Sequence, residues 1–130
     1  VNDITNPSEN IRGGTKYLAQ LRENFSNVED SIQRIKFTLA AYNCGLGHVR
    51  DAQRLTKAFG EDPNVWDDNV EDYLLKLSSR EFFNRPEVKY GFVRGREPYL
   101  YVQEIFLRYE HYKKLIPFKT PKAESQVASN

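Results

Sequence analysis

The stretch LAAYNCGLGHV, from Leu39 to Val49, constrains the fold more than any other part of this chain. Its apolar and small residues predict the last turns of a buried helix, and Gly45 predicts the sharp turn that ends it. A helix end that served packing alone would need only the glycine. This one also carries the hydroxyl of Tyr42 and the carboxamide of Asn43, so it predicts a helical fold with a candidate site at a helix terminus.

Helical periodicity extends over most of the chain, and no segment alternates as a half-buried strand would. Helix starts are predicted at Asn6-Pro7, Asn27, Asp67 and Pro98 from the preference of these residue types for N-caps and first turns. The sequence therefore predicts an all-α fold. The expected buried faces are Ile11, Gly14, Leu18, Leu21 and Phe25; Ile32, Ile35, Leu39 and Tyr42, widened by Ala40 and Ala41; Val49, Ala52, Leu55 and Phe59; Val70, Tyr73, Leu74 and Leu77; and Val102, Ile105, Phe106, Tyr109 and Ile116.

The chain has 130 residues, which is enough for one domain with one core. We assign residues 1–117 to this domain and expect the polar segment 118–130 to be a disordered tail. The helical pattern breaks between Ser78 and Arg96, where prolines, glycines and aromatic residues alternate. A long aromatic loop inside a compact domain is usually functional or pinned to the core.

The charge balance excludes electrostatic steering onto nucleic acid, because 19 Lys and Arg face 18 Asp and Glu and leave a net charge of +1. No apolar run approaches the roughly 20 residues that cross a bilayer. No targeting segment opens the chain at Val1, so we expect any export signal or membrane attachment of the parent protein to lie upstream.

Metal and cofactor sites are not predicted, because His48 and His111 are far apart in the sequence and no phosphate-binding glycine loop follows a strand. The single cysteine, Cys44, is expected to pack as a small residue rather than to act as a nucleophile. The acidic group at 67–72 is expected to be a solvated helix start. Glu97 stands where the irregular loop enters the last helix, and could cap that helix, pair with an arginine or face a ligand.

Three segments in a fixed order resemble the lytic transglycosylases of the lysozyme-like superfamily. The resemblance extends roughly from Thr5 to Ile116, and the combination of the three segments is far more specific than the AYN tripeptide alone. Together with DAQRLT at 51–56, the third is most similar to the branch called membrane-bound lytic murein transglycosylase F. The segments are NPSENIRGGTKYLAQL at 6–21, LAAYNCGLGHV at 39–49 and YGFVRGREPYLYV at 90–102.

This resemblance implies non-hydrolytic cleavage of peptidoglycan between N-acetylmuramic acid and N-acetylglucosamine, with an anhydro-muramyl end as product. It implies one glutamate that serves as both acid and base, and no cofactor. It also implies that Tyr42 points its hydroxyl into the site and that Asn43 holds the turn or a sugar acetamido group. Tyr101 would line the groove, and Glu97 would support it.

The expected position of the catalytic glutamate lies before the sequence at hand. In the family, a Glu-Ser motif and a Gly-Leu-Met-Gln-like segment precede the Asn-Pro helix, which here begins at Asn6, five residues after Val1. We therefore expect a lysozyme-like domain without its N-terminal catalytic helix, inactive by itself. An apolar face left open by that helix could be covered by a second copy of the chain.

Two other interpretations remain open at this point. One is a noncatalytic glycan-binding or adaptor module on the same fold, and the other is an unrelated helical interaction domain. For the family interpretation, the implied partner is the peptidoglycan glycan strand, and the implied location of the parent protein is the cell envelope, either the periplasm or the outer membrane.

Overall fold

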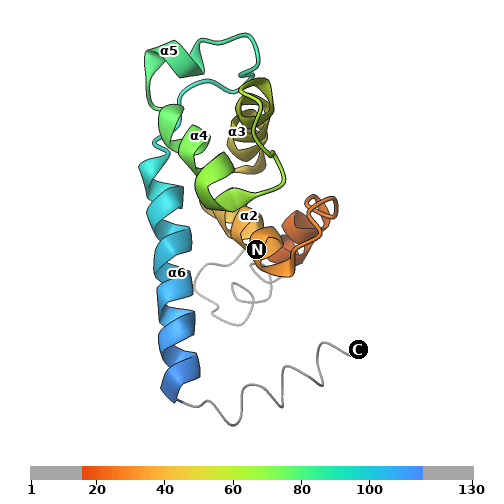
Figure 1. The fold of residues 1–130 in the computed structure, drawn as a ribbon, viewed down its shortest axis with the longest axis vertical. Coiled ribbons are helices and arrows are strands. Elements are labelled where there is room, and N and C mark those ends of the chain that lie inside the picture. Colours follow the sequence, from red (N-terminus) through yellow and green to blue (C-terminus); the bar gives the residue numbers. More distant parts are fainter. Residues whose placement is uncertain (1–15, 116–130) are drawn as a thin grey trace, which may run out of the picture.

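The computed structural model describes residues 16–115, and within this range every regular element is helical, as predicted. None of the described helices has the length and apolar character of a membrane span. The expected helix start at Asn6, the expected buried residues Ile11, Gly14 and Ile116, and the expected tail at 118–130 lie outside the described residues. The elements, most of them labelled in Figure 1, are a helix over 16–23, α2 (Ser31–Cys44), α3 (Leu46–Ala58), the π-helical turn η1 (Trp66–Val70), α4 (Glu71–Lys76), α5 (Arg80–Phe83) and α6 (Arg96–Leu115).

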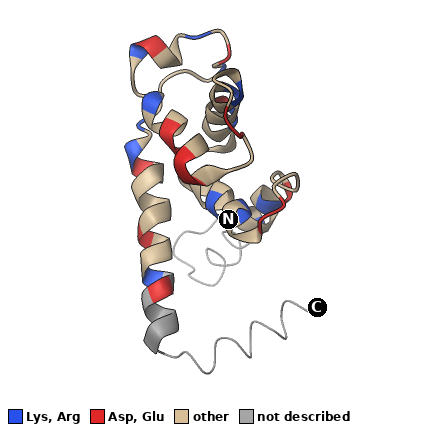
Figure 2. Ribbon diagram, in the orientation of Figure 1, with Lys and Arg blue, Asp and Glu red and all other residues tan. Residues whose placement is uncertain are grey.

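Helix α2 is the central element, because it packs against α3, α6 and η1. The long helix α6 runs along one side of the molecule, and α5 with the loop that follows it forms the end beyond α3 and α4 (Figure 1). Over the described part of the chain, acidic and basic residues are interspersed along the helices and do not form a single basic stripe (Figure 2).

An aromatic ladder forms the centre of the core. The rings of Phe25 and Phe37 stack with centroids 5.2 Å apart, and Phe37 meets Trp66 edge-on at 5.6 Å. These offset and edge-on contacts are the arrangements that aromatic quadrupoles favour. Several predicted core positions are confirmed around this ladder: Leu21, Val49, Ala52, Leu55, Val70, Tyr73, Leu74, Leu77 and Val102 are all buried.

The predicted face of α2 is wrong in part. The expected burial of Ala40 and Ala41 is confirmed, since both are fully buried. Ile32, Ile35 and Tyr42, however, are 44%, 37% and 40% exposed, and the fully buried ring of this helix is Phe37. Phe37 turns inward because Phe25 and Trp66, both distant in sequence, pack on its ring. Ile32, Ile35 and Tyr42 therefore form a partly exposed apolar stripe.

The predicted inward position of Phe59 is also wrong, since this ring is 45% exposed just after α3 ends. It lies against Tyr73 at 5.5 Å, and the guanidinium of Arg85 lies 4.6 Å above it. A cation over an aromatic face is attractive and keeps its own head in water. This contact explains how a large ring is held at the surface.

Two helix starts differ from prediction. Helix α2 begins at Ser31 because Asp30, not Asn27, is the N-cap, and its Oδ1 accepts hydrogen bonds from the amides of Ile32 and Gln33 at 2.9 and 3.0 Å. Asp67 does not cap α4, because its carboxylate is occupied by side chains of α2. Helix α6 begins at Arg96, two residues before Pro98.

Candidate functional site

The predicted helix end is present at the junction of α2 and α3. Helix α2 ends at Cys44, and Gly45 has φ 102° and ψ 144°, a conformation that only glycine adopts without strain. The amide of Gly45 donates to the carbonyl of Ala41 at 2.8 Å and closes the last turn. Tyr42 and Asn43 are both exposed in that turn, so their polar atoms are available to a ligand.

Three tyrosines from three helices converge beside this junction. The ring of Tyr17, in the helix over 16–23, lies 5.9 Å from that of Tyr42. Tyr101 of α6 lies close enough to Tyr42 to interact with it electrostatically. We call Tyr17, Tyr42 and Tyr101 the tyrosine cluster. It joins the end of α2 to the first half of α6 and brings together two of the four predicted binding residues.

Burial, and then the neighbouring Tyr42, raise the pKa of Tyr101 above its usual value. The phenol therefore stays neutral across the physiological range. A neutral tyrosine hydroxyl both donates and accepts a hydrogen bond, as recognition of a sugar hydroxyl requires.

Glu97 and Asn43 are placed by their positions in the helices. Glu97 lies in the first turn of α6, four residues before Tyr101, and is exposed. Residues four apart on a helix are neighbours on one face, so Glu97 lies one turn from the tyrosine cluster. Asn43 follows Tyr42 directly. Tyr42 and Tyr101 thus lie within electrostatic range of each other, and each of the other two predicted residues is near one of them along its helix.

Sequence reasoning missed a buried carboxylate that organises the loop beside this site. Asp51 of α3 is fully buried and forms an ion pair with Arg54. Its two oxygens accept hydrogen bonds from the amides of Lys89 and Tyr90, both at 2.8 Å. The loop between α5 and α6 is therefore pinned to the core, which confirms one of its two expected roles. The sequence does contain a signal for this role, since Asp51 is an acid in the middle of an apolar helix face.

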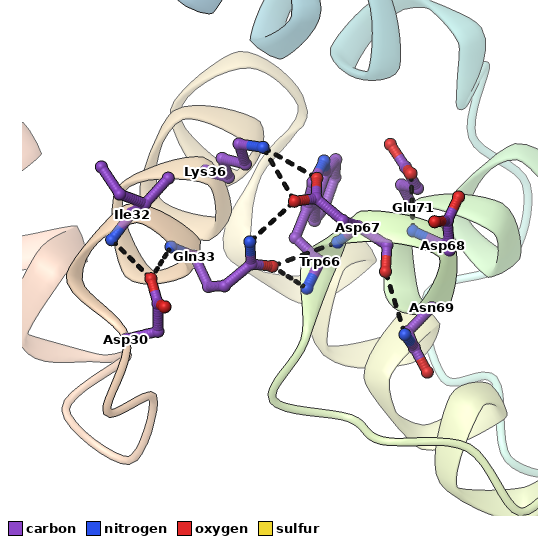
Figure 3. Close-up of polar contacts among 9 residues, drawn as sticks. All are labelled: Asp30, Ile32, Gln33, Lys36, Trp66, Asp67, Asp68, Asn69 and Glu71. Carbon is purple, nitrogen blue, oxygen red and sulfur yellow. Dashed lines mark hydrogen bonds and ion pairs between the residues drawn. The ribbon is translucent and has the colours of Figure 1, made fainter.

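A second polar network joins α2 to η1, as Figure 3 shows. The side-chain amide of Gln33 donates to Asp67 at 2.8 Å, and its oxygen accepts from the amides of Trp66 and Asp67 at 2.6 and 3.1 Å. Lys36 Nζ lies 2.8 and 3.0 Å from the two carboxylate oxygens of Asp67. This network fixes the position of η1, and with it Trp66, against α2.

The protonation state of Asp67 follows from these contacts. Partial burial opposes its ionisation, but the hydrogen bonds from Lys36 and Gln33 and the charge of Lys36 outweigh burial and lower the pKa of Asp67. The carboxylate stays ionised and paired, which indicates a structural role.

The other acidic residues of the group at 67–72 make local contacts or lie at the start of α4. Glu71 accepts a hydrogen bond at 2.7 Å from the amide of Asp68, which has a left-handed φ of 60°. Burial, opposed by that bond and reinforced by neighbouring acids, raises the pKa of Glu71. Glu71 and Asp72 lie in the first turn of α4, as expected of acids at a helix start.

The lone thiol is not poised for chemistry. Burial raises the pKa of Cys44 to about 12, so the nucleophilic thiolate is scarce at neutral pH. Within residues 16–115, no three histidine, cysteine, aspartate or glutamate side chains are grouped to hold a metal ion.

Comparison with known proteins points to one family. The family described as "Transglycosylase SLT domain" matches residues 1–65, half of the chain, which includes the α2–α3 junction. Proteins named "Membrane-bound lytic murein transglycosylase F" are similar over most of the chain. The one from Desulfosudis oleivorans is 40% identical over 114 residues, covering 88% of this chain and 24% of the relative.

Two further relatives of the same name give the same result. The protein from Serratia proteamaculans is 44% identical over 108 residues, which is 81% of this chain and 21% of the relative. The protein from Vibrio parahaemolyticus is 40% identical over 110 residues, which is 85% of this chain and 20% of the relative. The resemblance stated from the motifs is confirmed, and the chain spans about a fifth to a quarter of the length of these relatives.

Proposed function

Because the chain belongs to the transglycosylase SLT domain family, we propose that it is the part of a lytic transglycosylase that binds the peptidoglycan glycan strand. The observation that carries this proposal is the tyrosine cluster. It includes two of the four residues implied by the motifs, Tyr42 on α2 and Tyr101 on α6, and these two helices pack against each other although they are far apart in sequence.

The chemistry of the four residues suits an uncharged, N-acetylated sugar. The hydroxyls of Tyr42 and Tyr101 both donate and accept hydrogen bonds, and the carboxamide of Asn43 can pair with an acetamido group through one donor and one acceptor. Glu97 accepts hydrogen bonds from sugar hydroxyls. We assign these side chains to binding and orientation of the substrate.

In the proposed reaction, one glutamate carries out both proton transfers. It protonates the glycosidic oxygen as the bond to the muramyl anomeric carbon breaks. As a carboxylate it then takes the proton of the muramyl C6 hydroxyl, whose oxygen attacks that carbon. The products are an anhydro-muramyl end and a new free hydroxyl on the leaving sugar, with no water consumed. We place this glutamate before Val1, and general acid–base catalysis of this kind contributes about 10²–10⁴-fold.

A binding experiment tests the role of the tyrosines. Chitotetraose is titrated onto the full-length protein that contains this chain and onto its Tyr42→Phe and Tyr101→Phe variants. Tyr99→Phe is the matched control, since Tyr99 lines a separate cleft beside Lys36 and Asp67.

Loss of one sugar hydrogen bond of about 0.5–1.5 kcal/mol should raise Kd roughly two- to tenfold in each site variant. Equal binding by all four proteins would contradict the proposal. Binding without any cleavage by the full-length protein would favour a noncatalytic glycan-binding module.

We also propose that the parent protein acts in the cell envelope, where its substrate lies, and is attached to the membrane by segments outside this chain. The names of the similar proteins, which call them membrane-bound, support this placement. Fractionation of the producing cells, followed by detection of the protein in outer-membrane, inner-membrane and periplasmic fractions, tests it.

The exposed apolar stripe of α2 supports a proposal about assembly. Ile32, Ile35 and Leu39 line an open apolar cleft of about 280 Å³ together with Ile105 and Phe106 of α6. We propose that a second copy covers this face when the chain is isolated. Sedimentation should then give a dimer that Ile35→Glu converts to a monomer. A stable monomer with little dye-accessible apolar surface would contradict this.

A further inference from the structure

Tyr90 is an exposed aromatic residue in a loop whose position is tightly specified. Its side chain is 61% exposed. Single exposed hydrophobic residues are ordinary on protein surfaces and need no explanation by themselves. Tyr90 differs because its position is fixed by a buried carboxylate and by a glycine. Burying a carboxylate costs free energy unless charge and hydrogen bonds compensate it.

The first of these groups is the buried carboxylate of Asp51. Removing a carboxylate from water is unfavourable unless charge and hydrogen bonds compensate it. Here Arg54 supplies the charge, and the amides of Lys89 and Tyr90 supply the hydrogen bonds. Arg54 Nε also donates to the carbonyl of Glu87 at 2.9 Å. The segment that ends at Tyr90 is thus held at three points, Glu87, Lys89 and Tyr90, by two side chains of α3.

The second group is Gly47, which provides the surface under the tyrosine ring. A Cβ atom placed on Gly47 would lie 2.9 Å from Cδ2 of Tyr90, so the ring packs directly on the helix backbone. The ring of His48 lies 6.4 Å away and nearly perpendicular to it. Gly91, with φ 76°, turns the chain away directly after the tyrosine. One part of the ring is therefore seated while the rest faces solvent.

Gly47, on which the ring of Tyr90 packs, is close in the chain to the proposed site. Gly47 is four positions after Asn43, so their backbones can be at most about 14 Å apart. The same short junction that presents Tyr42 and Asn43 thus carries the surface on which Tyr90 rests. A rigid exposed ring beside polar sugar-binding groups is suited to the apolar C–H face of a pyranose ring.

We propose that Tyr90 is a further glycan-binding residue, which stacks on a sugar ring next to the one held at Tyr42 and Asn43. This inference rests on the proposed function and deepens it, because it assigns a second contact along the same strand. Asp51 and Gly47 act as positioning residues, which hold the ring and do not touch the sugar.

The test compares the affinity for chitotetraose of Tyr90→Ala, Tyr90→Phe and Gly47→Ala in the full-length protein, by calorimetric titration. Phe92→Ala is the matched control, since Phe92 is also an exposed aromatic residue of this loop. Thermal unfolding of each variant separates a binding role from a structural one. Gly47→Ala keeps the tyrosine and displaces its ring, so the test does not depend on Tyr90→Ala folding normally.

We expect Tyr90→Ala to raise Kd about tenfold, which corresponds to about 1.4 kcal/mol. Tyr90→Phe and Phe92→Ala should bind as the unaltered protein does, and Gly47→Ala should bind more weakly. Unchanged affinity in Tyr90→Ala or Gly47→Ala, with weakened binding in Tyr42→Phe, overturns this inference and leaves the proposed function standing. Absence of binding by the unaltered protein overturns both.

Discussion

Replacement of Asp51 by asparagine tests whether its carboxylate holds the loop between α5 and α6 in place. The carboxylate accepts two backbone amides at 2.8 Å and pairs with Arg54. An asparagine oxygen can keep one amide bond, while its NH₂ group faces the other N–H and the guanidinium. Hydrogen bonds to charged groups contribute about 1.5–3 kcal/mol each. We therefore expect a loss of about 3 kcal/mol, at the lower end of the cost of breaking a buried ion pair.

Urea unfolding measures this loss, and amide hydrogen exchange locates it. The amides of Lys89 and Tyr90 should exchange much faster in Asp51→Asn than in the unaltered protein. Asp68→Asn is the matched control, because Asp68 is exposed and asparagine tolerates its left-handed φ. The control should differ by less than about 0.5 kcal/mol. Equal stability of the two variants, or unchanged exchange at both amides, would show that the Asp51 carboxylate does not hold this loop.

Four other changes have distinct expected outcomes. Gly95→Ala should lower the free energy of unfolding, measured by thermal unfolding, by more than about 3 kcal/mol, because its Cβ would collide with the backbone of Leu74. A Cβ at Gly45 meets open space, so Gly45→Ala should lower the free energy of unfolding only by the backbone strain of about 1–3 kcal/mol. The pKa of Asp67 is lowered by folding, so its stabilising effect is present above the unfolded-state pKa and is lost as the pH falls through the folded-state pKa. Asp67→Asn should therefore flatten the acid side of a plot of unfolding free energy against pH. Cys44 should resist alkylation at pH 8, since its pKa is about 12, and Cys44→Ala should leave peptidoglycan cleavage by the full-length protein unchanged.

Helix existence could be predicted from the sequence, but the face that each helix buries was predicted less well. The spacing of apolar residues in α2 favoured a face containing Ile32 and Ile35 over the face containing Phe37. The structure reverses this choice because Phe25 and Trp66 pack on Phe37. Those partners come from separate segments, and periodicity within one helix contains no information about them.

For the candidate site as well, local features could be predicted from the sequence and contacts between distant segments could not. The helix end at Gly45 and the polar pair before it could be predicted locally, because turn chemistry depends on neighbouring residues. The approach of Tyr101 to Tyr42 depends on how α6 packs on α2, and only the family resemblance pointed to it. The role of Asp51 was missed because its partners are backbone amides almost forty residues away, which have no signature in the side-chain sequence.

We propose that this chain binds the glycan in an enzyme that forms anhydro-muramyl ends. The most direct measurement is mass spectrometry of the products released from purified peptidoglycan by the full-length protein and by its Tyr42→Ala variant. We expect muropeptides one water lighter than hydrolysis products, released more slowly by the variant at equal folded concentration. Hydrated reducing ends, or equal rates of release from the two proteins, would contradict this proposal.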